Sequence, residues 1–174
     1  MDDLRGQGSP PSLINASLPV YNKVLSALLH TAPLDNPRRA FMVEFMHDRL
    51  LLENVVIVAG KAGMQLQVFG ILWQRFLEDL ATGLMPDDFR IISVSELTDI
   101  IDNGSQGDAI DDLNVRRAIN RLQLDLMETV RRNLGWPIER EDIIQNLRAD
   151  GKRRKRNGYR INPSMVLPKA TSCS

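Results

Sequence analysis

The sequence predicts an α+β fold, and three observations lead to this class. Short runs of branched and aromatic residues between positions 41 and 58 are typical of strands in a small antiparallel sheet. Apolar residues spaced three and four apart from Leu113 to about Asn133 predict a long helix with one buried face. Two segments, Ile143 to Leu147 and Gly158 to Asn162, flank a basic loop and predict a β-hairpin.

The strand prediction for positions 41 to 58 has a helical alternative. No glycine or proline interrupts the chain from Ala40 to Val58, so a single helix is also compatible with this composition. The apolar runs are short, however, and His47-Asp48 and Glu53-Asn54 separate them as turns would. We therefore predict three strands here.

Two more helices are expected between the sheet and the long helix. The first begins near Met64 and ends at Gly83, with an apolar stripe that should be buried and comprises Leu72, Trp73, Phe76, Leu77 and Leu80. The second begins at a capping box formed by Ser93 and Glu96 and continues through Leu97, Ile100 and Ile101. A loop from Asn103 to Asp112 follows, and its last two aspartates favour the positive end of the long helix.

The first 37 residues are predicted to form an appendage to this domain, which should span residues 38–167. Residues 1 to 16 combine glycine and proline with small polar residues, so we expect them to be flexible. An amphipathic helix from Ser17 to Leu29 and a linker from Ala32 to Pro37 should follow. The sequence leaves open whether the apolar stripe of this helix packs on the domain, binds a partner or forms a homodimer. Residues 168–174 are expected to be a disordered tail.

Composition limits the functions that this chain can perform. The chain has 174 residues, of which 43% are hydrophobic and 25% charged, as in ordinary soluble proteins. No apolar run is long enough for a membrane helix and the chain opens with Asp2-Asp3, so we expect a cytoplasmic protein without membrane contact. A single cysteine and two histidines predict neither disulfide nor metal site, and we find no cofactor loop or catalytic constellation. We expect no enzyme activity.

Charge is distributed unevenly along the chain. The formal net charge is zero, yet the segment from Leu113 to Arg160 holds 13 Lys or Arg and 6 Asp or Glu, a net charge of +7. An acidic body with a basic C-terminal half is a common layout for a DNA-binding surface, although ordinary solvated charge also produces it.

The long helix and the hairpin loop supply the candidate DNA contacts. Arginine, asparagine and glutamine carry paired groups that match base edges in the major groove, and those projecting from this helix are Arg116, Arg117, Asn120 and Gln123. Like charges crowded in one loop favour polyanion binding. The residues expected on phosphates are Arg121, Lys152, Arg153, Arg154, Lys155, Arg156 and Arg160. A solvated polar helix face remains the alternative interpretation of the helix alone.

Two stretches resemble the OmpR/PhoB-type winged-helix DNA-binding domains. The run from Val115 to Leu126 is similar to their recognition helix, with Ile119-Asn120-Arg121-Leu122 matching an Ile-x-Arg-Leu core, and Gly158-Tyr159-Arg160 resembles their closing wing strand. Ser93 to Leu97 and Met64 to Leu72 are similar to the starts of the second and first helices. The resemblance covers positions 40 to 163.

The resemblance implies a winged helix-turn-helix: a small N-terminal antiparallel sheet, a three-helix core and a C-terminal hairpin wing, here preceded by an extra helix. It also implies a stand-alone bacterial-type transcription regulator without a receiver domain, which binds double-stranded DNA and can touch RNA polymerase through the loop 103–112. Gln123 and Asp125 depart from the family's basic pattern, and Asp125 would repel phosphate. The rival interpretation is a winged-helix protein-interaction module that binds another regulator or RNA polymerase with weak or no DNA binding.

Overall fold

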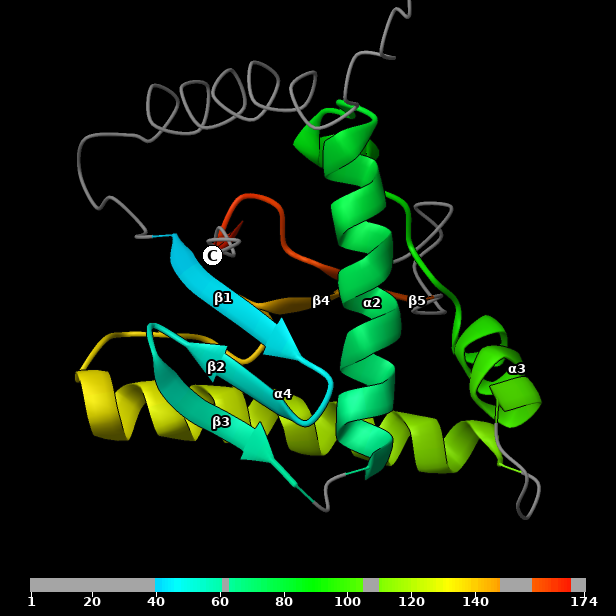
Figure 1. Ribbon diagram of the computed structural model, residues 1–174, viewed down its shortest axis with the longest axis horizontal. Coiled ribbons are helices and arrows are strands. Elements are labelled where there is room, and N and C mark those ends of the chain that lie inside the picture. The colour runs from blue at the N-terminus through cyan, green and yellow to red at the C-terminus, as the bar shows by residue number, and fades with distance from the viewer. Residues whose placement is uncertain (1–39, 61–62, 105–109, 148–157, 170–174) are drawn as a thin grey trace, which may run out of the picture.

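The computed structural model describes residues 40–60, 63–104, 110–147 and 158–169 (Figure 1). Three strands come first, then three helices with a short 3-10 helix between two of them, then three more strands. The elements are β1 (Phe41–Met46), β2 (Arg49–Leu52), β3 (Val55–Ala59), α2 (Gly63–Ala81), η2 (Pro86–Asp88), α3 (Val94–Gly104), α4 (Asp112–Leu134), β4 (Ile144–Leu147), β5 (Gly158–Ile161) and β6 (Val166–Pro168). The protein is thus α+β, with a small sheet and three described helices, an arrangement that is compatible in general with a winged helix.

The N-terminal sheet has the strand order β3-β2-β1-β6. Strands β1, β2 and β3 pair antiparallel, as predicted, so the helical alternative for positions 41 to 58 is wrong. Glu53 and Asn54 join β2 to β3 with positive φ angles of 50° and 66°, a conformation that suits the twist of a two-residue hairpin turn. Alternate side chains of β1 and β2 face the core, where Phe41, Val43 and Leu50 are buried.

The sequence did not predict β6, which pairs parallel with β1 and makes the sheet mixed. The backbone amide of Phe41 also donates to the carbonyl of Met165 at 2.6 Å. Beyond β6, Lys169 Nζ bonds to Glu44 Oε2 at 2.7 Å and to Asn54 Oδ1 at 3.0 Å. Strand β6 thus ends at Pro168, and the amide of Lys169 donates to the carbonyl of Val43 beyond it.

Helices α2 and α4 contact each other and the two sheets (Figure 1). Trp73 and Phe76 of α2 are buried in the core as expected, whereas Leu77 is 39% exposed and was wrongly assigned to the stripe. Ser93 Oγ caps α3 by accepting from the amide of Glu96 at 3.1 Å, the first half of the predicted capping box. The carboxylate of Glu96 instead pairs with Arg75 on α2 at 3.1 Å, so this residue joins two helices.

The hairpin formed by β4 and β5 is attached to the core through a third short segment. Ile92 and Tyr159 exchange two backbone hydrogen bonds, of 2.9 and 2.8 Å, beside the start of β5. Gly158 lies so close to this segment that a Cβ atom would be 2.3 Å from the carbonyl oxygen of Ile92. The glycine before Tyr159 is thus required by the approach of two backbones.

Candidate nucleic-acid interface

Helix α4 is fixed at both ends and along one face. Asp111 is its N-cap, since its Oδ1 accepts from the amide of Asn114 at 2.7 Å. The helix ends at Gly135, which adopts the left-handed conformation with φ 66° and donates to the carbonyl of Arg131. The predicted buried face is confirmed by the burial of Val115, Ile119, Leu122, Leu126 and Val130. The other side of the first three turns is left to solvent.

This solvent-facing side forms an exposed strip, defined here by Leu113, Arg116, Arg117, Asn120 and Arg121. Within the described part of the chain, no residue forms a hydrogen bond or ion pair with the guanidinium of Arg116 or of Arg117. The third, Arg121, is 72% exposed and its Nε lies 3.1 Å from Asp125 Oδ1. The structure thus brings together three of the four predicted base-reading residues and one predicted phosphate-binding residue.

Asp125, which was expected to repel phosphate, is held by two other side chains. Its Oδ2 accepts from Gln65 Nε2 at 2.9 Å, and its Oδ1 faces Arg121. Gln65 stands near the start of α2, so the carboxylate ties that start to the middle of α4. The charge of Asp125 is balanced within the protein, and its side chain is only 25% exposed.

Gln123 was predicted to read bases, and the structure corrects this assignment. Only 3% of the residue is exposed, and its Nε2 donates to the backbone carbonyl of Ile144 at 2.8 Å. A buried amide that is bonded to a β4 carbonyl has no access to a DNA groove. Gln123 instead joins α4 to the first strand of the hairpin.

Arg160 was predicted to bind phosphate, and this assignment is also corrected. Its guanidinium donates to the carbonyls of Pro86, Asp87 and Phe89 at 3.1, 3.2 and 3.0 Å and to Gln145 Oε1 at 2.9 Å. Burial lowers the pKa of the Arg160 guanidinium, while Asp87 and Asp79 oppose that shift. Two nitrogens of the guanidinium, Nη1 and Nε, are thus engaged inside the fold.

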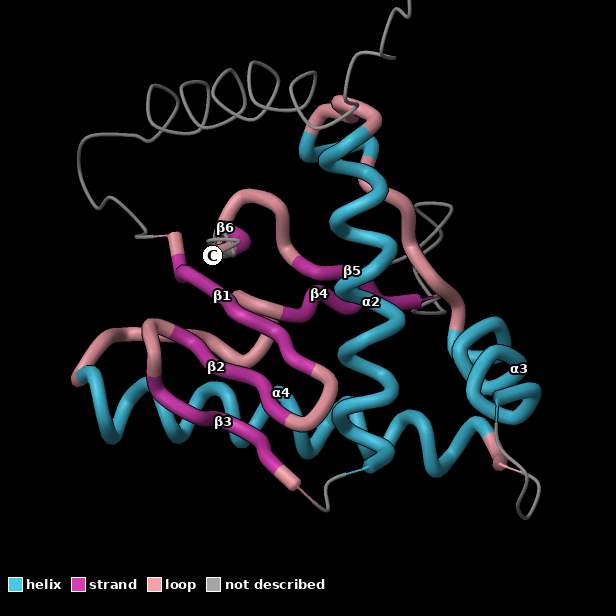
Figure 2. The backbone as a smooth tube through the Cα atoms, viewed as in Figure 1, coloured by secondary structure: helices cyan, strands magenta, loops and turns pink. Residues whose placement is uncertain are grey.

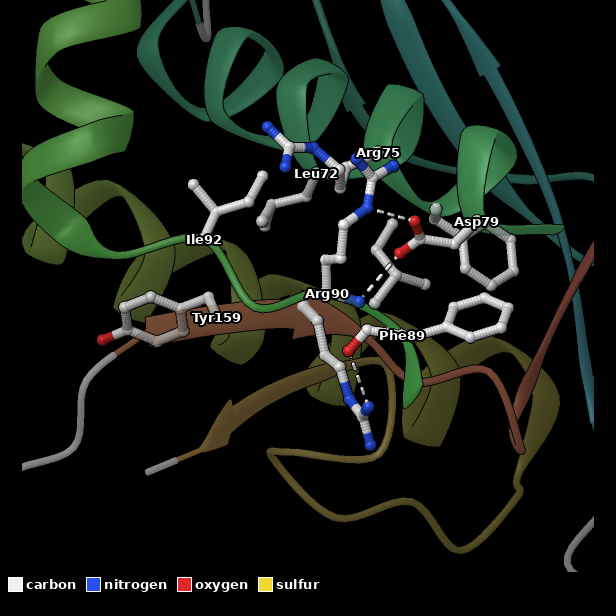
Figure 3. A pocket seen from close by; sticks show the side chains of 10 residues that line it. Leu72, Arg75, Asp79, Phe89, Arg90, Ile92 and Tyr159 are labelled. Atoms are coloured by element: carbon white, nitrogen blue, oxygen red, sulfur yellow. Dashed lines mark hydrogen bonds and ion pairs between the residues drawn. The ribbon is translucent and has the colours of Figure 1, made fainter. Parts of the chain in front are cut away.

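The neighbouring pocket at the base of the hairpin is filled by its own side chains (Figure 3). Asp79 is 1% exposed and accepts from the amide of Arg90 at 2.9 Å, and its Oδ1 also faces Arg90 Nε. These bonds raise the pKa of the Arg90 guanidinium, the contact with Asp79 having the largest effect. The charged groups here hold the chain before Ile92 against α2, and no space remains for a ligand.

A second surface feature is a groove of about 550 Å³ that is bordered by α2, α3 and the turn between β1 and β2. The ring of Phe45 lies close to Gly70, and Ile71 and Ile100 also line the groove. Ile100 is 40% exposed. Gly104, the last residue of α3, borders the groove at one end.

Several predicted features lie outside the described residues. They are the phosphate-binding set Lys152, Arg153, Arg154, Lys155 and Arg156, the N-terminal helix Ser17 to Leu29, and positions 105 to 109 of the loop expected to touch RNA polymerase. In the described remainder of that loop, the amide of Ile110 donates to Asp102 Oδ1 at 3.2 Å.

Sequence reasoning missed two residues of this surface. Arg140 contacts the exposed strip directly, because its Nη2 donates to Asn120 Oδ1 at 2.7 Å. Its neighbours Glu139, Glu141 and Asp142 conceal its charge in any count along the sequence. Leu113 is 50% exposed on the first turn of α4, where the periodicity alone marked it only as the beginning of the helix.

No family model matches the chain, and no curated protein and no solved structure is significantly similar to it. The resemblance to OmpR/PhoB-type domains therefore stays a prediction from the quoted residues. Among the described residues, no group of three His, Cys, Asp or Glu side chains is arranged to hold a metal ion, and no helix has the length and apolar character to cross a bilayer.

Proposed function

We propose that the protein is a sequence-specific DNA-binding transcription regulator of the winged-helix type. In this proposal α4 enters the major groove with its exposed strip toward the bases, and the β4–β5 hairpin approaches the flanking phosphates. The observation that carries the proposal is the exposed strip itself. It presents Arg116 and Arg117 without any described acidic partner, beside an asparagine held in place by Arg140.

The chemistry of the strip fits a groove better than it fits bulk solvent. Arginine pairs with guanine edges and asparagine with adenine edges through two hydrogen bonds each, and both types lie here within two turns of helix. These turns are the N-terminal ones, which contact bases in helix-turn-helix proteins. The C-terminal part of α4 lies along the N-terminal sheet (Figure 1), and the N-terminal turns lie away from it. The strip on these turns is therefore accessible.

The hairpin supports the same proposal through its attachment to α4. The hydrogen bond from Gln123 fixes β4 against α4. Strand β4 ends at Leu147, so the basic residues that follow it are connected to a strand that is held against the proposed recognition helix. The basic run from Lys152 to Arg156 lies within ten residues of the end of that strand in the sequence. A basic loop next to a recognition helix offers charge to phosphates without reading sequence.

Binding titrations test the proposal. A duplex enriched from a random library by the wild-type protein is compared with a scrambled duplex of the same composition. We expect tighter binding to the enriched duplex, and Arg116→Ala should cost about 1–3 kcal/mol there with unchanged thermal stability. Arg132→Ala is the matched control, because Arg132 is equally charged and exposed but lies in the last turn of α4. Equal affinity of the wild type for both duplexes would contradict the proposal.

The groove bordered by α2 and α3 favours a second candidate function, a protein-interaction module that binds another regulator or RNA polymerase. Ile100 is exposed on this groove, and Gly104, which borders it, belongs to the segment 103–112 that was expected to touch RNA polymerase. This alternative predicts no discrimination between duplexes, whereas Ile100→Glu should abolish partner binding. The titrations above therefore decide between the two functions.

A further inference from the structure

A hydrogen-bonded chain of four groups connects the hairpin to the exposed strip of α4. The carbonyl of Ile144 accepts from Gln123 Nε2 at 2.8 Å, and Gln123 Oε1 accepts from Arg140 Nε at 3.2 Å. Arg140 Nη2 then donates to Asn120 Oδ1 at 2.7 Å. The segment between α4 and β4, which carries Arg140, returns from the end of the helix toward the hairpin (Figure 2).

The direction of every hydrogen bond in this chain is determined by chemistry. A backbone carbonyl only accepts and a guanidinium only donates, so neither Gln123, which lies between them, nor Asn120, which lies beyond the guanidinium, has a choice of orientation. Gln123 must turn its nitrogen to Ile144 and its oxygen to Arg140. Asn120 must turn its oxygen to Arg140, and its Nδ2 group therefore points elsewhere.

We propose that Arg140 is a positioning residue for sequence readout, which fixes the amide of Asn120 so that its Nδ2 hydrogens are presented to a purine N7 in the major groove. This inference rests on the proposed function. No described residue accepts a hydrogen bond from Asn120 Nδ2, so its two donors remain for the ligand. Purines present N7 as an acceptor in that groove, and the second lone pair of Oδ1 stays available for the amino group of adenine.

A guanidinium is required at position 140 because it holds two donor nitrogens in one rigid plane. Its Nε and Nη2 donate in parallel to two different side chains, one buried and one exposed. A lysine ammonium carries the same charge on a flexible stem and does not hold two acceptors in a fixed plane. An Arg140→Lys variant thus removes the positioning and keeps the charge.

This variant separates positioning from simple attraction to phosphate. We expect Arg140→Lys to bind the scrambled duplex as tightly as wild type, with the same dependence on salt concentration. Its discrimination between the enriched and the scrambled duplex should fall about tenfold, which is the effect of one lost base contact. Arg132→Lys, the matched control on the last turn of α4, should change neither quantity. Circular dichroism at the binding temperature shows that each variant is folded.

Two further measurements assign the effect to Asn120. The double variant Asn120→Ala with Arg140→Lys should discriminate no worse than Asn120→Ala alone, because both changes remove the same contact. Replacing purines of the enriched duplex one at a time by 7-deazapurines should weaken wild-type binding at the purine that Asn120 reads and at any guanine that an arginine reads. Of these positions, only the one read by Asn120 should become insensitive to the replacement in Arg140→Lys.

The outcomes distinguish this inference from the function on which it rests. If the wild type discriminates and Arg140→Lys discriminates equally well, Arg140 positions nothing and only this inference falls. A similar loss of affinity on both duplexes in Arg140→Lys, with unchanged discrimination, would also overturn it, since the guanidinium would then act as a contact to phosphate. If the wild type does not discriminate at all, the proposed function and this inference fall together.

Discussion

The exposed strip of α4 and the base of the hairpin both carry arginine side chains, but the two regions use them in opposite ways. On the strip, Arg116 and Arg117 meet no hydrogen-bond acceptor among the described residues. At the hairpin base, Arg160 donates to three backbone carbonyls and Arg90 to a buried carboxylate. The arginines at the base use their donors within the fold, whereas the guanidinium groups of Arg116 and Arg117 are available to a ligand.

The difference shows that net charge is a poor guide to a phosphate-binding surface. All the arginines of the segment from Leu113 to Arg160 contribute equally to its charge of +7. Only those whose donors lack partners in the fold gain new hydrogen bonds when an anion arrives. Predictions for the two regions therefore differ in the quantity that changes: folding stability at the base and DNA binding on the strip.

The largest effect is expected from Gly158→Ala at the hairpin base. The added Cβ would meet the carbonyl oxygen of Ile92 at 2.3 Å, so the two backbones must separate and lose the pairing with Tyr159. We expect a loss of about 3 kcal/mol in the free energy of unfolding, measured by urea denaturation. Gly63→Ala is the control, because no described atom lies within 4 Å of its added Cβ. Equal stability of the two variants would show that the hairpin base is not tightly packed.

Arg160→Lys tests the assignment of this residue to the fold. Lysine keeps the charge but has one nitrogen in place of two, so it cannot bond to the carbonyls of Pro86, Asp87 and Phe89 and also to Gln145, and we expect a loss of about 2 kcal/mol in stability. The salt dependence of DNA binding should not change. A variant with normal stability and a reduced salt dependence would restore the phosphate-binding role that the sequence suggested.

Local sequence patterns were sufficient for most of the fold. The spacing of apolar residues placed α4 within one residue at each end, and the turn signals at Glu53-Asn54 separated β2 from β3. Strand β6 was missed because it has only three residues and pairs with β1, more than a hundred positions earlier in the chain. Parallel pairing over such a separation leaves no signal in the neighbouring residues.

The candidate site was less predictable because exposure depends on how the elements pack. Periodicity placed Arg116 and Asn120 on the strip, but Gln123 differs from them only by its angle around α4 and by the arrival of β4 beside it. The same arrival brings Arg140 to Asn120 across twenty positions of sequence. Contacts made by a returning loop follow from tertiary structure and not from local pattern.

Arg117→Ala should have a smaller effect than the two changes at the hairpin base, and it should change DNA binding in place of folding stability. Since no described residue bonds to this side chain, its removal should leave the unfolding free energy within about 0.5 kcal/mol of wild type. If Arg117 reaches a phosphate, the slope of log Kd against log salt concentration should fall by about one unit on any duplex. If it reads a base, the loss should be confined to the enriched duplex. No change on either duplex would remove Arg117 from the interface.

The smallest expected effect concerns Leu113, the apolar member of the exposed strip. Leu113 and Asn120 are seven residues apart, nearly two full turns, so they lie on the same side of α4. A leucine that is 50% exposed on the first turn of a recognition helix is placed to contact the methyl group of a thymine.

Replacing thymine by uracil removes only that methyl group and measures this contact. We expect one such replacement in the enriched duplex to weaken wild-type binding by about 0.8 kcal/mol, the value of one buried carbon. In Leu113→Ala the same replacement should have no effect, because the side chain that covers the methyl is gone. Met85→Ala, which shortens a side chain that is 64% exposed at the start of η2, should retain the wild-type response. A response to uracil that persists in Leu113→Ala would assign the methyl contact to another residue, and the strip would then read DNA through its polar members alone.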